Sequence, residues 1–330
     1  MNYLRRFALI ILSILVLLMG SSDLNAKKDH SNYELIDGKN GAKEVKPTER
    51  GKEALEKAGD AYRHENYVSV QDYIGEGFML EPDNGTDVIA ENQREDVEKA
   101  VKTFFLENYK TEVKISNIVG TTGAASVFVE SVGEPHFYTL AIVPVDTDNK
   151  TIKADEVWSL EGEIEQAIIT GLLAMIYDEE FKTLDTHLAS IAKDFPVAGT
   201  KEEALANVGA NKFATPYYRL STYLTPFKDL LDLYLENPDR SKEEWKSHGE
   251  KIKYDPEKLI IAIEFFMADK EVEPDAELLE KIANDIEKMD DLPRAKYVIY
   301  IHDNYVDKTS GSGNKENSIR LGNPDLIIKE

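Results

Sequence analysis

Apolar residues recur with two different patterns in the middle of the chain. Between residues 95 and 109, Val97, Val101 and Phe105 repeat every four positions, and oppositely charged side chains also lie four apart. This spacing predicts an amphipathic helix. The pattern then changes to four strand-like runs: 111–120, 124–133, 136–145 and 151–160. Because short polar connections separate these runs, we expect an antiparallel meander.

After residue 160 the apolar spacing becomes helical again. Prolines and one capping box indicate where later helices begin: Pro226, Pro256, Pro274, and Ser241 with Glu244. Residues 295–302 predict a buried strand, residues 307–317 a mobile loop, and residues 323–330 a final strand. The whole pattern predicts an α+β fold, with a helix packed on an antiparallel β-meander over 66–160. A mainly helical C-terminal half with one or two late strands, over 161–330, completes it.

The N-terminal apolar run is too short for an ordinary membrane-spanning helix. It covers thirteen residues, 7–19, and follows Arg5 and Arg6. A spanning helix needs about 20 apolar residues, whereas the apolar core of a signal peptide has about 7–15. We therefore expect residues 1–26 to be a signal peptide. An uncleaved N-terminal anchor is the alternative.

The end of this leader resembles a lipoprotein processing site that lacks the lipid-accepting residue. The residues considered for processing are Gly20, Ser21, Ser22 and Ala26. The chain contains no cysteine, and a serine hydroxyl is a much weaker nucleophile than a thiolate. We therefore expect no lipid on Ser21. Cleavage after Ser22 or after Ala26 remains open.

Charge and composition narrow the classes of partner. Residues 27–50 are polar and predict a flexible tether, and residues 51–330 predict a single globular unit. The net charge of −23 opposes binding to nucleic acid, so we expect none. Contact with a membrane is expected only through the N-terminal segment. The absence of cysteine excludes disulfides, thiolate metal sites and thiol nucleophiles.

No sequence motif identifies a reaction, a cofactor or a metal. Phosphate-binding, dinucleotide-binding, zinc-protease, hydrolase and calcium-loop motifs are all missing from the sequence. We therefore predict no catalytic residue, no cofactor and no metal ligand, and assign no reaction class. His136 beside aromatic residues, and Tyr217, Tyr218 and Arg219, are the candidates for a surface or pocket. Packing within the core is the competing interpretation for each of them.

Four stretches carry a resemblance to a known family: YVSVQDYIGEGFML, FFLENYKTEVKISNIVG, VFVESVGEPHFYTLAIVP and ENPDRSKEEWK. The chain from about residue 67 to residue 330 resembles domain-of-unknown-function family 1672, described as lipoproteins of staphylococci and related Gram-positive bacteria. The resemblance implies export but no activity, substrate or catalytic residue. It also implies a lipid-bearing cysteine, which this chain replaces with Ser21.

Together these observations predict an exported protein outside the cytoplasm, either membrane-associated or released. We expect it to bind an unidentified cell-envelope or extracellular partner at the cell surface or wall. The alternative is a cell-envelope enzyme with an acid/base site that the sequence does not reveal. A third interpretation is an interaction protein that binds another protein through its tyrosine-rich segment, residues 215–224.

Overall fold

The computed structural model describes residues 33–37, 43–47, 52, 57, 59, 61–63, 65–80, 85–209, 212–249, 251–322 and 326–330. It divides into two units, 1–62 and 63–330. In the first unit, β1 (Tyr33–Asp37) and β2 (Lys43–Pro47) form an antiparallel pair. This pair lies in the segment predicted to be a flexible tether. The leader residues 1–26 lie outside the described residues.

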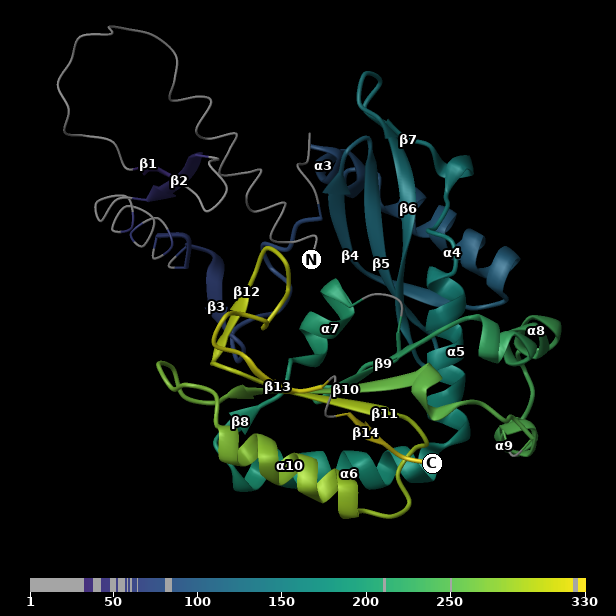
Figure 1. Ribbon diagram of the computed structural model, residues 1–330. Coiled ribbons are helices and arrows are strands. Elements are labelled where there is room, and N and C mark those ends of the chain that lie inside the picture. Colours follow the sequence, from purple (N-terminus) through teal and green to yellow (C-terminus); the bar gives the residue numbers. More distant parts are fainter. Residues whose placement is uncertain are drawn as a thin grey trace, which may run out of the picture. The chain divides into compact units, whose positions relative to one another are not determined.

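The unit 63–330 contains helices together with sheets whose strand pairs are mostly antiparallel, in agreement with the predicted α+β class (Figure 1). Its helices, with the 3₁₀ turns η1 to η3, are α3 (Thr86–Glu91), α4 (Arg94–Tyr109), η1 (Ala154–Glu156), α5 (Glu163–Ile176), α6 (Asp178–Asp194), α7 (Glu202–Val208), η2 (Thr225–Phe227), α8 (Lys228–Glu236), α9 (Lys242–Gly249), η3 (Pro256–Lys258) and α10 (Ala276–Lys288). Its strands are β3 (Tyr67–Ser69), β4 (Val113–Thr121), β5 (Ala124–Ser131), β6 (Tyr138–Asp146), β7 (Thr151–Ile152), β8 (Val197–Ala198), β9 (Tyr218–Thr222), β10 (Leu259–Met267), β11 (Lys296–His302), β12 (Tyr305–Asp307), β13 (Ile319–Leu321) and β14 (Ile327–Ile328).

The first sheet is antiparallel throughout, in the order β4-β5-β6-β7. Helix α4 buries Val97, Val101 and Phe105, the residues whose spacing predicted it, and it packs on β4 and β6. Helix α5 is apolar on nearly all sides because it contacts both β6 of this sheet and β9 of the second sheet. Gly171 permits this close packing, since an added Cβ would lie 2.6 Å from the carbonyl oxygen of His136.

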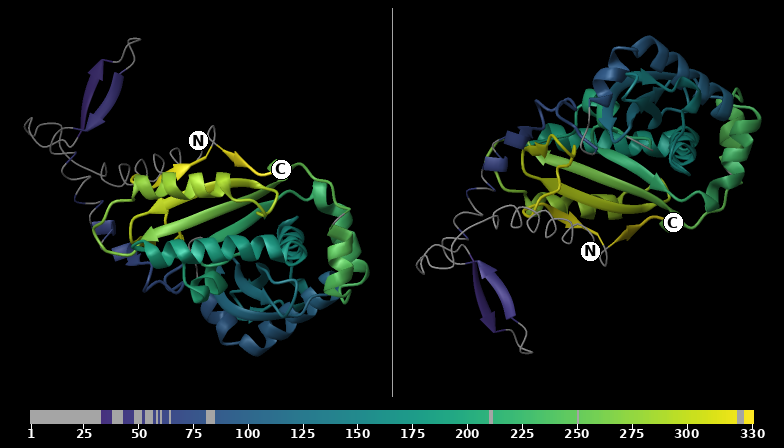
Figure 2. Two further views of the ribbon diagram at one scale, coloured as in Figure 1. Left: turned by 90° about the horizontal axis from the view of Figure 1, so that it is seen from below. Right: turned by 90° about the horizontal axis from the view of Figure 1, so that it is seen from above.

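The second sheet is mixed and has the order β13-β11-β10-β8, with β14 also paired to β11 and β9 to β10. Strands β10 and β11 are parallel, and α10 connects them. Helices α6 and α10 cover one face of this sheet (Figures 1 and 2). Alternate residues of β10 and β11, including Ile263 and Ile299, are fully buried in the hydrophobic core. Glu264 and His302 occupy the alternating positions that face away from these helices.

The prediction of only one or two late strands in the C-terminal half was wrong, although helices still cover more of the described residues after 160 than strands do. Within the described residues after 160, seven strands accompany the helices, and six of them form the second sheet. Pro256 begins a short 3₁₀ turn, and β10 follows it directly. The sequence of β10, LIIAIEFFM, is a nearly continuous apolar run, as is usual for a strand buried on both faces. Periodicity alone does not separate such a run from a buried helix.

Candidate functional site

A pocket of about 600 Å³ lies where the parallel strands β10 and β11 end. In open α/β sheets, ligands bind at the carboxyl ends of parallel strands. Four short segments line it: the start of β3, the β10–α10 loop, the β11–β12 connection and the β12–β13 loop. We call it the strand-end pocket, and its lining residues are Arg63, Tyr67, Glu271, Val272, Glu273, Asp303, Tyr305, Lys315, Glu316 and Asn317.

The aromatic wall of the strand-end pocket comes from the antiparallel ribbon of β3 and β12. Val68 lies opposite Val306, and Val306 is buried in a small apolar cluster. Because side chains alternate along a strand, Tyr67 and Tyr305 occupy the other face of the ribbon. The apolar side of the ribbon therefore fixes both tyrosines on the side of the pocket.

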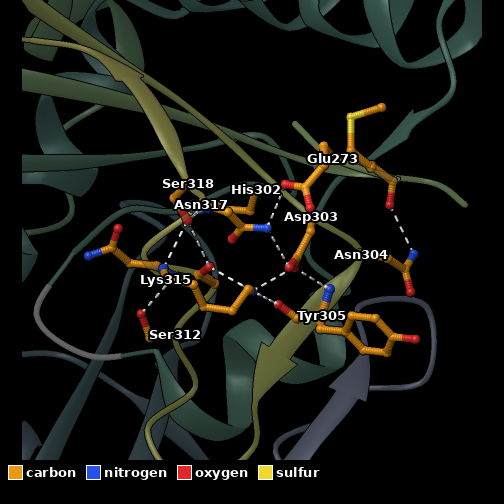
Figure 3. A network of polar contacts seen from close by, with 12 residues as sticks. Glu273, His302, Asp303, Asn304, Tyr305, Ser312, Lys315, Asn317 and Ser318 are labelled. Atoms are coloured by element: carbon orange, nitrogen blue, oxygen red, sulfur yellow. Dashed lines mark hydrogen bonds and ion pairs between the residues drawn. The ribbon is translucent and has the colours of Figure 1, made fainter. Parts of the chain in front are cut away.

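Lys315 is a cation whose hydrogen bonds are all made within the protein. Its Nζ lies 2.7 Å from Asp303 Oδ1 and 2.9 Å from the carbonyl oxygen of Gly313, and it also donates to the carbonyl oxygen of Tyr305 (Figure 3). Burial lowers the pKa of Lys315, while Asp303 acts in the opposite direction. The ammonium also lies 5.4 Å from the centre of the Tyr67 ring. An ammonium has three donors, so three acceptors satisfy it.

Two carboxylates of the pocket, those of Glu271 and Glu273, are held by neutral donors. The Nδ2 of Asn317 lies 3.0 Å from Glu273 Oε2 and 3.1 Å from Asp303 Oδ2, so one amide bridges two acids (Figure 3). The hydroxyl of Tyr305 donates to Glu271 Oε1 at 2.9 Å, and this hydrogen bond raises the pKa of Tyr305. Glu271 and Glu273 are therefore oriented by hydrogen bonds from uncharged side chains.

A charge cluster around the fully buried His302 supports the pocket from the sheet. We call Arg219, Glu264 and His302 the Glu264 cluster: Arg219 forms an ion pair with Glu264, and His302 Nε2 lies 3.0 Å from Glu264 Oε1. Burial alone would raise the pKa of Glu264, but Arg219 and His302 lower it to about 2. His302 Nδ1 lies 2.8 Å from Ser318 Oγ, which ties the end of the β12–β13 loop to the sheet.

The contacts of Ser318, His302 and Glu264 resemble the connections of a hydrolase triad, but their surroundings are structural. The side chain of His302 is fully buried. Ser318 Oγ also accepts the backbone N–H of Lys315 at 2.9 Å and lies 3.3 Å from the carbonyl oxygen of Gly313. A nucleophile must reach its substrate and be oriented by its base. This hydroxyl instead closes a turn.

The described part of the chain contains neither a metal-binding group nor a membrane-crossing helix. No group of three or more His, Cys, Asp or Glu residues is arranged there to hold a metal ion. Among those same residues, no helix combines the length and apolar character needed to cross a membrane.

Comparison with known proteins gives one family and one fold. A family model described as "Protein of unknown function (DUF1672)" matches residues 60–329. The chain belongs to the DUF1672 family. The predicted resemblance is thereby confirmed. A crystal structure of a DUF1672 protein from Staphylococcus aureus subsp. aureus Mu50 is similar with a TM-score of 0.64 and 16% identity, covering 78% of this chain and 97% of that one. At that identity the similarity establishes the fold alone. No protein with curated function matches.

His136 and Tyr218, two of the residues proposed from sequence, do not line the strand-end pocket of this DUF1672 protein. His136 is 3.0 Å from Glu130 in the first sheet, and its ring packs against Tyr138 and Phe213. Tyr218 is buried and also packs against Phe213. These contacts bring His136 and Tyr218 to the same aromatic group within the fold. The leader candidates Gly20, Ser21, Ser22 and Ala26 lie outside the described residues.

The other two candidates differ in what they contact. The Tyr217 ring centre lies 5.4 Å from that of Phe265, so Tyr217 packs on the second sheet. Arg219 joins the Glu264 cluster, which supports the pocket without lining it.

The β12–β13 loop is where sequence reasoning missed the site. Its glycines and serines predicted a mobile loop, yet it supplies Lys315 and Asn317 to the pocket. Gly313 lies directly on the sheet, and an added Cβ would be 2.9 Å from His302 Cδ2. In the sequence, a lysine two residues after a glycine is only a weak indication of a binding site. Two acceptors for that lysine, Asp303 and the carbonyl oxygen of Tyr305, come from the β11–β12 connection and β12, so only the fold reveals its role.

Proposed function

We propose that this DUF1672 protein is exported and acts at the cell surface or wall by binding a ligand in the strand-end pocket. The observation that carries the proposal is a preformed polar pocket at the ends of β10 and β11 whose internal charges are already satisfied. Such a pocket has no need to rearrange before a ligand binds, and preorganisation favours binding. The proposal of export rests on the leader of residues 1–26.

A steric block tests the binding proposal without changing charge. Val272 lines the pocket and is 39% exposed, so Val272→Trp places an indole at the pocket with little effect on packing. Val88→Trp, at an exposed position on α3, adds the same side chain elsewhere. We expect wild type and Val88→Trp to sediment with isolated cell envelopes, and Val272→Trp to remain in the supernatant. Equal sedimentation of all three proteins would contradict a role for the pocket.

Fractionation of cells followed by intact mass of the native protein tests export. A species outside the cytoplasm that begins at Asp23 or Lys27 without added lipid mass supports cleavage and release. A membrane-bound species that retains residues 1–22 supports the anchor alternative. Recovery only in the cytoplasm would contradict the proposal.

The alternative of an envelope enzyme has one observation in its favour, the contact of Ser318 with His302 at 2.8 Å. An activated serine reacts with fluorophosphonate reagents because its base removes the hydroxyl proton. We expect no labelling of the folded protein. Labelling that disappears in Ser318→Ala would favour the enzyme.

A further inference from the structure

We propose that the strand-end pocket takes an organic cation, an ammonium or guanidinium group carried by a larger ligand such as a basic peptide. This inference rests on the binding function proposed above and names the chemistry of its ligand. The feature behind it is the difference between the two halves of the pocket. The inner half is closed by its own ion pair, whereas the outer half carries an excess of oriented carboxylates.

The inner half has no charge left for a ligand. Lys315 uses its three donors on Asp303, Gly313 and Tyr305. Asp303 in turn accepts from Lys315 and from the backbone N–H of Tyr305 through Oδ1, and from Asn317 through Oδ2. A lysine in this state does not offer an N–H to an anion. The pocket is therefore poorly suited to phosphate or carboxylate ligands.

The outer half is negative. Glu271, Glu273 and Glu316 line it and are exposed, with Arg63 as the opposing cation. Glu271 accepts one hydrogen bond from Tyr305, and Glu273 accepts one from Asn317. An ionised carboxylate has about four acceptor positions, so each retains capacity for a donor. Their orientation is set before the ligand arrives, because Tyr305 and Asn317 belong to the pocket wall.

The aromatic wall of the pocket also favours an ammonium or guanidinium group. Tyr67 already lies beneath an ammonium, that of Lys315, and Tyr305 shares its face of the ribbon. The face of an aromatic ring attracts ammonium and guanidinium groups through its quadrupole. The net charge of −23 also raises the rate at which cations approach.

A bare metal ion does not fit this arrangement. Within the described residues, the acidic side chains of the pocket do not converge as a group of three that could hold a metal. The pocket volume of about 600 Å³ also suits a molecule with many atoms. A ligand that fills this volume can contact more than one of the lining acids.

Isothermal titration of the full chain with tri-lysine tests the inference. The matched probes are tri-glutamate and the neutral sugar N,N′,N″-triacetylchitotriose. The test variant is Glu271→Gln with Glu273→Gln, which removes two charges and retains an oxygen acceptor for Tyr305 and for Asn317. The control variant is Glu95→Gln with Glu107→Gln, which removes two exposed charges from α4.

We expect saturable binding of tri-lysine at one site, no binding of tri-glutamate, and weaker binding as NaCl increases. The pocket variant should bind tri-lysine roughly tenfold more weakly, and the α4 variant within about twofold of wild type. Absence of saturable tri-lysine binding, or equal loss in both variants, would overturn the inference.

The two proposals fail in different ways. Binding of the chitotriose that disappears in Val272→Trp would overturn the cation ligand and leave the pocket as a binding site. If tri-lysine does not bind and Val272→Trp still sediments with envelopes, both proposals are overturned.

Discussion

Two clusters, each made of a basic residue, a glutamate and a histidine, lie in the two sheets of this protein, and their surroundings differ. The Glu130 cluster, Lys114, Glu130 and His136, lies on the first sheet, and the Glu264 cluster lies on the second. In both, histidine Nε2 is 3.0 Å from a glutamate Oε1. The side chain of His136 is 28% exposed, whereas that of His302 is fully buried. The same contact is therefore partly solvated in one sheet and enclosed in the other.

The difference follows from how each sheet is built. Lys114 and Glu130 face each other across an antiparallel pair, and His136 is six residues from Glu130. The Glu264 cluster joins β9, β10 and β11, with 45 residues between Arg219 and Glu264 and 38 between Glu264 and His302. Only chain segments distant in sequence can enclose a charge group on several sides. The pocket is built on the enclosed cluster.

The largest effect is expected from Glu264→Ala. The substitution leaves the buried ring of His302 and the partly exposed cation of Arg219 without their acceptor, and losing a hydrogen bond to a charged group costs about 1.5–3 kcal/mol. Urea unfolding at pH 7 measures the loss. A loss below about 1 kcal/mol would show that the two clusters are energetically alike.

We expect the loss of folding stability at low pH to come mainly from protonation of Glu264. The pKa of Glu264 is about 2 in the folded protein, below its ordinary value of 4.5. A depressed pKa stabilises the fold above pH 4.5, and this stability is lost as pH falls toward 2. The contribution is about 3 kcal/mol at most. Urea unfolding between pH 6 and pH 3 should show a steep fall for wild type and a flatter profile for Glu264→Gln. Parallel profiles would contradict this assignment.

Two glycine substitutions distinguish the stability lost through a steric clash from the stability lost through backbone strain. Gly313→Ala places a Cβ 2.5 Å from Phe266 Cζ, beside the Glu264 cluster, and we expect a loss of about 1–3 kcal/mol. Gly123→Ala in the β4–β5 turn meets nothing within 4 Å but forces alanine to a φ of 70°, which costs about 1–2 kcal/mol. Thermal unfolding compares the two.

Ligand binding gives a second measurement, besides thermal unfolding, for comparing Gly313→Ala with Gly123→Ala. Only Gly313→Ala should also weaken ligand binding, because its loop carries Lys315 and Asn317. If Gly123→Ala weakens binding equally, the effect is one of overall stability and not of the pocket.

The smallest effect is expected from Glu130→Ala. Lys114 is 63% exposed and His136 partly so, so both regain water when Glu130 is removed. Lys114 and His136 lower the pKa of Glu130 although burial opposes them. Exposed pairs contribute about 0–1 kcal/mol, and urea unfolding should show a loss in that range. A loss equal to that of Glu264→Ala would remove the contrast between the sheets.

Local pattern was sufficient for the elements whose partners are near in sequence. The helical spacing of Val97, Val101 and Phe105 predicted α4 to within one residue at its start. The capping box of Ser241 and Glu244 also forms, with hydrogen bonds of 2.8 and 3.3 Å. These features depend on contacts between residues three or four apart. Such contacts can be read directly from the sequence.

The mixed sheet and the strand-end pocket were decided by tertiary structure. The apolar run of β10 became a strand because β9 and β11, both distant in sequence, supply its hydrogen bonds. Lys315 became a fixed part of the pocket because Asp303 and the backbone of Tyr305 surround it. The role of a charged side chain depends on the groups that remove it from water and on the opposite charges beside it. Sequence alone determined elements such as α4 and the family, whereas only the tertiary structure brought together the charged side chains of the strand-end pocket.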